Sequence, residues 1–239
     1  MTSPNFLNND YVEPVIAILY CLPGFIAYYR ISASSGIYSF IRGKSGADKE
    51  QASWVVFQRI TGVIFLGLIP AFICLVLFDK TLVDYGVMIG NPVISLYWIL
   101  GSGILIIIVN MIFAGKPGNM NIYPQIRAKV WSLGLIVINS VSWMAYLLAY
   151  EFLIRGFLLF SCERAFSQWQ AIAINTVIYS LVHIPKGAKE TIGAIPFGYI
   201  LCLITFETGT IWVAFFSHVI LALSNDYFSL YYNPEMKIK

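Results

Sequence analysis

The sequence predicts an all-α protein, a polytopic membrane helix bundle of about seven to eight helices. Of its 239 residues, 59% are hydrophobic and 11% are charged, whereas about 25% of the residues of a soluble domain are charged. Apolar runs approaching the roughly 20 residues that a spanning helix needs follow one another along the chain. We therefore expect a single membrane-embedded domain over residues 1–239.

Seven apolar runs are candidate spans. The first is short and is interrupted by Pro23-Gly24, so it either crosses the bilayer or lies in its interface. The fourth has 35 residues and would form a helix of about 50 Å, which must protrude or kink. The runs cover residues 14–29, 54–78, 93–114, 130–164, 168–184, 191–206 and 210–230.

Lysine and arginine placement predicts the orientation, because cytoplasmic loops carry an excess of both. If residues 130–164 form one helix, the basic clusters at 30–49, 116–129, 186–189 and 237–239 all lie inside, with Lys80 and Arg164 outside. The C-terminus is then cytoplasmic. Without a eukaryotic retention or transit signal, we expect a bacterial inner membrane.

The net charge and the cysteine spacing argue against two other kinds of protein, those that bind nucleic acid and those held by disulfides or zinc. A net charge of +3, spread along the chain, forms no nucleic-acid-binding patch. The four cysteines have no CxxC spacing and lie in apolar runs, which is typical of buried small hydrophobic residues. Arg59 is near the inner end of the second run, and we interpret it as an interfacial anchor whose side chain reaches the headgroups.

Four ionisable residues lie at membrane depth: Glu151, Arg155, His183 and His218. Such residues are costly there and usually functional. Glu151 and His183 are equally distant from the turn at 162–168, so antiparallel helices place them at one depth, and His218 is expected near mid-depth. A structural interpretation stays open, because Glu151 and Arg155 have the i, i+4 spacing of an ion pair and a membrane histidine can join two helices.

The fourth run also carries a polar and aromatic stripe. Its residues fall at i, i+4, i+7 and i+11, which is one helical face, and they are Asn139, Trp143, Tyr146 and Tyr150. This face is predicted to look into the bundle, as core or as the wall of a cavity.

A glutamate and two histidines that lie together can catalyse hydrolysis. Glu151 can act as general base on a water held with His183, and His218 can stabilise the developing oxyanion. The same three side chains can ligate zinc with an open fourth position. Because the sequence has no HExxH motif, we expect no metal and keep zinc as an alternative.

Two motifs carry a family resemblance. YEFLIRGFLLF resembles EExxxR, the first motif of the CAAX-protease and bacteriocin-processing family of intramembrane glutamic endopeptidases. YSLVH resembles the second motif, FxxxH, with Tyr179 in place of Phe. The resemblance covers about residues 125–228. We therefore divide the domain into poorly matched N-terminal spans at 1–124 and a peptidase-like core at 125–230.

The resemblance implies a multi-helix membrane protein with a cavity open to the cytoplasm. It implies that Glu151 and His183 activate water, that Arg155 supports the glutamate, and that His218 stabilises the oxyanion. Two positions depart from the family pattern. Tyr150 stands where the first of two glutamates is usual, and Ala222 stands where Asn or Asp is usual, so that Asn225 is the candidate substitute.

The predicted function is therefore intramembrane endopeptidase activity on a membrane-associated or lipidated peptide, with membrane lipid as the other partner. The alternatives are a non-catalytic member that binds a peptide in the same cavity, and a transporter or proton relay. Tyr150, Tyr179 and Lys186 are candidate substrate-binding residues. Lys186 has two further interpretations, as a basic residue of a cytoplasmic loop or as a ligand of an anionic lipid.

Overall fold

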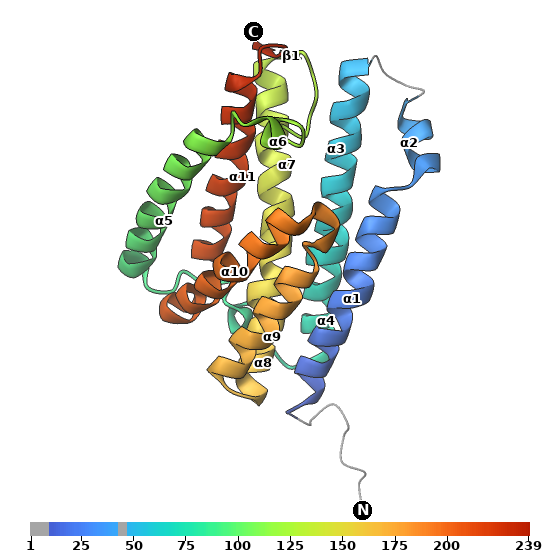
Figure 1. Ribbon diagram of the computed structural model, residues 1–239. Coiled ribbons are helices and arrows are strands. Elements are labelled where there is room, and N and C mark those ends of the chain that lie inside the picture. Colours follow the sequence, from blue (N-terminus) through green and yellow to red (C-terminus); the bar gives the residue numbers. More distant parts are fainter. Residues whose placement is uncertain (1–9, 43–46) are drawn as a thin grey trace, which may run out of the picture.

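The computed structural model describes residues 10–42 and 47–239, so that Lys44 of the first basic cluster lies outside the described residues. The described chain is a helical bundle (Figure 1), which confirms the all-α prediction. Its elements are α1 (Val12–Ser32), α2 (Ser35–Arg42), α3 (Ala47–Val63), η2 (Ile64–Leu68), α4 (Ile69–Leu77), η3 (Leu82–Tyr85), α5 (Pro92–Phe113), α6 (Pro117–Met120), β1 (Val130–Trp131), α7 (Leu133–Glu151), η4 (Phe152–Leu158), α8 (Leu159–Ala165), α9 (Gln168–Leu181), η5 (Ile184–Lys186), α10 (Ala188–Thr208), α11 (Trp212–Tyr232) and β2 (Lys237–Ile238).

Six helical segments in the described part of the chain are long and apolar enough to cross a membrane, which makes this an integral membrane protein. The first predicted run forms one of them, and the fourth forms a continuous helix of 33 residues from Leu133 to Ala165, as the basic residues require. The fifth run forms α9, which has 14 residues. At about 1.5 Å per residue α9 is about 21 Å long, shorter than a hydrocarbon core of about 30 Å. The fifth predicted run is therefore not among the segments that are long enough to cross a membrane alone.

The central helix is the joined α7–η4–α8 segment, with α11 on one side and α3 on the other (Figure 1). α5 packs on the far side of α11, and α9 packs on α10. α2, α6 and the C-terminus lie at one end of the bundle, and α8 lies at the other. The helix that carries Glu151 is thus surrounded by protein along its second half.

Local sequence signals fix the ends of several helices. Asn91 caps α5 by accepting a hydrogen bond from the Ile94 amide at 3.1 Å, and Ser132 caps α7 by accepting one from Leu135 at 3.3 Å. Such caps satisfy amide groups that a helix leaves unpaired at its start. Gly209, with φ of 67°, ends α10 in the left-handed region that favours glycine.

A glycine allows a close approach between η2 and α7. A Cβ atom at Gly67 would lie 2.6 Å from Ala149 Cβ and 3.1 Å from Ala149 Cα, closer than atoms can pack. Small residues at helix interfaces allow backbones to approach in membranes, where dispersion contacts drive association. Gly67 therefore sets the distance between these two segments, one turn from the predicted site.

A polar cluster joins the first helix to the end of the central one. Glu13 of α1 accepts hydrogen bonds from Tyr85 at 2.8 Å and from Ser161 at 2.9 Å, and it pairs with Arg164. This carboxylate connects the N-terminal part of the chain to α8.

Candidate active site

An ionic triad forms the centre of the predicted site. Glu151 is the last residue of α7 and Arg155 lies in η4, and both side chains are fully buried. Glu151 Oε1 lies 2.6 Å from Nδ1 of His218 on α11, and Glu151 Oε2 lies 3.3 Å from Arg155 Nη1. The structure therefore brings Glu151 and His218 into direct contact across two helices and also forms the i, i+4 ion pair.

Neighbouring helices shield Arg155. Its guanidinium lies 4.1 Å from the centre of the Tyr179 ring of α9, a cation–π contact, and Nη2 donates to the Gly198 carbonyl of α10 at 3.4 Å. A Cβ atom at Gly198 would lie 2.6 Å from Tyr179 Cδ1, so the glycine makes room for that ring. The guanidinium is held between two helices and away from lipid.

Both histidines have a defined tautomer when neutral. His183 Nδ1 lies 2.7 Å from the Tyr179 carbonyl oxygen, and because a carbonyl only accepts, Nδ1 carries the hydrogen. His218 Nδ1 faces the Glu151 carboxylate and likewise donates. Each ring therefore keeps Nε2 as a hydrogen-bond acceptor.

Tyr150 stands between these two histidines. Its ring centre lies 5.7 Å from that of His218, 6.3 Å from that of His183 and 6.0 Å from that of Tyr179. The side chain is buried and its hydroxyl has no hydrogen-bond partner. The first position of the YExxxR motif therefore faces both histidines, whereas its second position faces His218 and Arg155.

The contacts of Glu151 and Asn225 define their places in the structure. Glu151 Oε2 has no hydrogen-bond partner, so the carboxylate bonds to His218 and not to His183. Asn225 accepts a hydrogen bond from Asn119 at 3.0 Å, near the other end of α11, and the structure does not bring it to His218. The seven residues that separate Asn225 from His218 correspond to about 10 Å along a helix, which is the physical reason. Ala222 is buried in the core.

A second buried ionic cluster was missed by the sequence reasoning. Arg59 is only 3% exposed, donates to the Asn139 carbonyl at 3.0 Å and the Asn139 amide oxygen at 2.9 Å, and lies 3.9 Å from Asp226. Its guanidinium also lies 4.1 Å from the Trp143 ring centre. The prediction that Arg59 is an interfacial anchor is therefore wrong. The sequence contained two signals for this cluster, which are the carboxylate of Asp226 in the last apolar run and Asn139 on the polar stripe.

The inward orientation of the stripe on α7 is confirmed, since all four of its residues are at most 6% exposed. Toward the end of the bundle that carries the C-terminus, part of this stripe borders a cavity of about 220 Å³. Eleven residues line the cavity: Tyr28, Tyr29, Ser32, Ala33, Val55, Gln58, Arg59, Gln125, Trp143, Tyr146 and Lys186. Lys186, a predicted substrate-binding residue, lines this cavity while its side chain is largely exposed.

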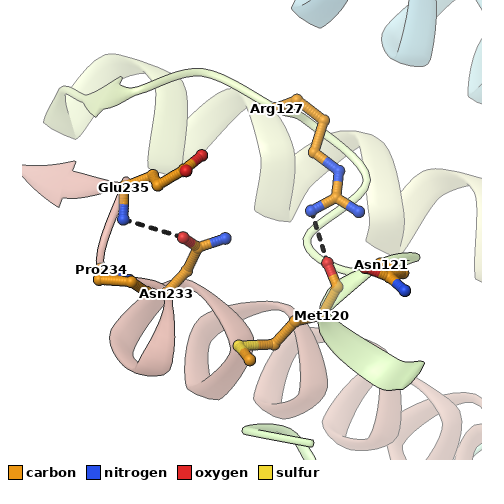
Figure 2. A pocket seen from close by; sticks show the side chains of 6 residues that line it. All are labelled: Met120, Asn121, Arg127, Asn233, Pro234 and Glu235. Atoms are coloured by element: carbon orange, nitrogen blue, oxygen red, sulfur yellow. Dashed lines mark hydrogen bonds between the residues drawn. The ribbon is translucent and has the colours of Figure 1, made fainter. Parts of the chain in front are cut away.

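A hollow near the C-terminus is formed by loops (Figure 2). In it Arg127 donates to the Met120 carbonyl at 2.7 Å, and the Glu235 amide donates to Asn233 at 3.0 Å. None of the predicted site residues lines it. Each of these contacts lies within a single loop, and the hollow is not the candidate site.

A metal site requires several ligating side chains that meet at one point. Across residues 10–42 and 47–239, no three side chains of His, Cys, Asp or Glu come together as a metal ion would require. Near the two histidines, the Glu151 carboxylate is bonded to His218 Nδ1 and to Arg155.

The comparisons with known proteins agree with the motifs. Residues 129–224 match the model of a family described as Rce1-like, type II CAAX prenyl endopeptidase. Over these residues the chain is similar to the CAAX-protease family. The predicted resemblance is thus confirmed for the segment that contains the triad, both histidines and Tyr150. A search of curated proteins and a search of solved structures found no match.

Proposed function

We propose that this protein is an intramembrane endopeptidase in which His218, paired with Glu151, activates the attacking water. The observation that carries the proposal is the 2.6 Å contact between Oε1 of the fully buried Glu151 and Nδ1 of His218, which is 13% exposed. A carboxylate on Nδ1 fixes the imidazole orientation and stabilises the imidazolium that forms when Nε2 takes a proton. The ion pair with Arg155 keeps the carboxylate charged and oriented.

The reaction follows from these positions. His218 Nε2 takes a proton from water as the water oxygen bonds to the carbonyl carbon of the scissile peptide, whose oxygen becomes an oxyanion. When the carbonyl reforms, the carbon–nitrogen bond breaks and His218 returns the proton to the leaving amine. The products are a carboxylic acid and an amine, so the step needs no further reactant.

His183 and Tyr150 complete the site in this proposal. His183 Nε2 accepts the second hydrogen of the same water, which agrees with the sequence-based assignment of His183 to water activation. The Tyr150 hydroxyl is buried without a partner and donates to the oxyanion. A single donor of this kind contributes about 3–4 kcal/mol of transition-state stabilisation.

The substrate we propose is a membrane-associated or lipidated peptide, because the site lies within the membrane-spanning bundle. Membrane lipid is the other partner, and neither nucleic acid nor a resident metal is involved. From the placement of lysine and arginine we propose a cytoplasmic C-terminus, and the membrane that we propose is a bacterial inner membrane.

The test is the appearance of new peptide termini in membranes from cells that make the wild type or a single variant. His218→Gln is expected to abolish the new termini, and His183→Gln to reduce them about 10–100-fold, since it removes one contact to water. Lys80→Gln, in a loop at the opposite end, serves as the control. If His183→Gln abolishes cleavage while His218→Gln only weakens it, His183 is the base and our assignment is overturned.

A second candidate function is peptide binding without hydrolysis. The observation that favours it is Tyr150, whose ring occupies the space between the histidines where the family usually has a glutamate. In this case the wild type retains a peptide uncut, and Tyr150→Glu gains cleavage. If Tyr150→Glu instead removes a cleavage that the wild type performs, the binding function is excluded.

A further inference from the structure

The cavity beside Arg59 has the chemistry of an anion site. It lies between α1, α3, α7 and η5, at the end of the bundle that the basic residues assign to the cytoplasm. It contains none of the residues of the proposed active site. Tyr146 separates the two regions, since its ring lines the cavity and lies 6.1 Å from that of Tyr150.

Hydrogen-bond donors dominate the polar lining. Arg59 is 3% exposed and its Nε has no hydrogen-bond partner, although both terminal nitrogens are engaged. The hydroxyl of Ser32, 7% exposed, has no partner either. Buried donors without partners are destabilising, and a bound acceptor would satisfy them.

The charges leave an excess positive charge in the lining. Asp226 lies 3.9 Å from Arg59 and neutralises it. Lys186 forms no ion pair within 4.0 Å in the described part of the chain. Glu190, one helical turn further on, lies outside the lining, where its charge acts on Lys186 and it accepts from Tyr123 at 3.4 Å. The cavity therefore suits a group with one negative charge.

The remaining walls suit a lipid. Tyr28, Trp143 and Tyr146 lie side by side with ring centres 5.7 and 5.9 Å apart, and aromatic residues of this kind are enriched at membrane–water interfaces. The outward faces of α1 and α3 nearby expose apolar side chains such as Ile26 and Ile60, against which acyl chains can lie. Basic pockets between membrane helices on the cytoplasmic side bind anionic headgroups.

We propose that this cavity binds the phosphodiester headgroup of an anionic phospholipid, with Arg59, Ser32 and Lys186 as its donors. The proposal does not depend on peptide hydrolysis. It selects the lipid interpretation of Lys186 over the recognition of a substrate carboxylate. A lipid held here borders the active site through Tyr146.

The test uses the full chain purified in a neutral detergent and follows thermal unfolding during titration with phosphatidylglycerol. We expect the midpoint to rise by about 4 °C when free lipid is tenfold above its dissociation constant. Lys186→Gln is expected to require roughly fivefold more lipid for half of the shift, because one basic residue near the surface contributes about that factor. Lys186 is exposed, so this variant folds without loss of a buried contact.

Lys189→Gln is the matched control, since Lys189 is an exposed lysine of the same segment that does not line the cavity. It is expected to titrate like the wild type. The proposal is overturned if both lysine variants weaken the response equally, which indicates general surface attraction. It is also overturned if inorganic phosphate alone reproduces the shift, or if Lys186→Gln responds like the wild type.

Discussion

Replacement of Glu151 by glutamine tests the ionic triad, because it removes a charge without changing the size of the side chain. At 3.3 Å, the pair with Arg155 corresponds to about 5 kcal/mol of Coulomb attraction at an effective dielectric constant of about 20. Removing one member of a buried pair leaves the other charge uncompensated and costs about 3–5 kcal/mol. Since glutamine still offers an amide oxygen, we expect Glu151→Gln to lose about 3 kcal/mol, or about 6–12 °C in the unfolding midpoint.

The double variant separates stability from activity. Glu151→Gln/Arg155→Met has no orphaned guanidinium, so we expect about 2 kcal/mol of the loss to be recovered, measured as a coupling energy in a double-mutant cycle. Peptide cleavage should stay about 10⁴-fold below the wild type in both, because the partner of His218 is missing. Additive losses of the two single variants would refute the ion pair as described, and a stable Glu151→Gln protein with full cleavage would refute the proposed role of Glu151.

Three further predictions follow from other features. Gly67→Ala should destabilise the protein by about 1–3 kcal/mol in thermal unfolding, because the new Cβ meets the backbone of Ala149, and an unchanged midpoint would contradict this packing. Incubation with EDTA should leave peptide cleavage within about twofold of the untreated protein, because no three His, Cys, Asp or Glu side chains of the described residues converge as metal ligands, and a loss restored by zinc would be the opposite result. The pKa of Asp84 is lowered by hydrogen bonds from the Thr81 amide and hydroxyl. Asp84→Asn should therefore lower the midpoint at pH 7, and the gap to the wild type should close as the pH falls below about 4, where the carboxylate is protonated; a gap that stays constant with pH would exclude this contribution.

The sequence was sufficient for the features that depend on local pattern. Apolar runs located all six long helical segments, and the basic residues required the unbroken fourth one. The depth comparison placed Glu151 and His183 at one depth with His218 near mid-depth, and of these the structure brings Glu151 and His218 into contact. Each of these inferences needs only helix rise, span length and the sign of loop charges.

Other features depended on contacts that distance along the chain does not reveal. Arg59 is near the end of its helix, where a side chain can reach water, yet its partner Asp226 is 167 residues away. The packing of α3, α7 and α11 determines whether the Arg59 side chain reaches water or Asp226. Likewise, the spacing of Asn225 from His218 suited one helix face, but only the structure revealed that Asn119 binds it.

The polar cluster at Glu13 has a consequence for the boundaries of the folded protein. The segment that matches the family begins at residue 129 and ends at residue 224, yet Arg164 and Ser161 within it rely on an acceptor on α1. A polypeptide cut to the matched segment would present an unpaired arginine at one end of its central helix. The matched segment is therefore shorter than the unit that can fold, and the less recognisable N-terminal helices are as necessary to a preparation of this protein as the residues that carry its motifs.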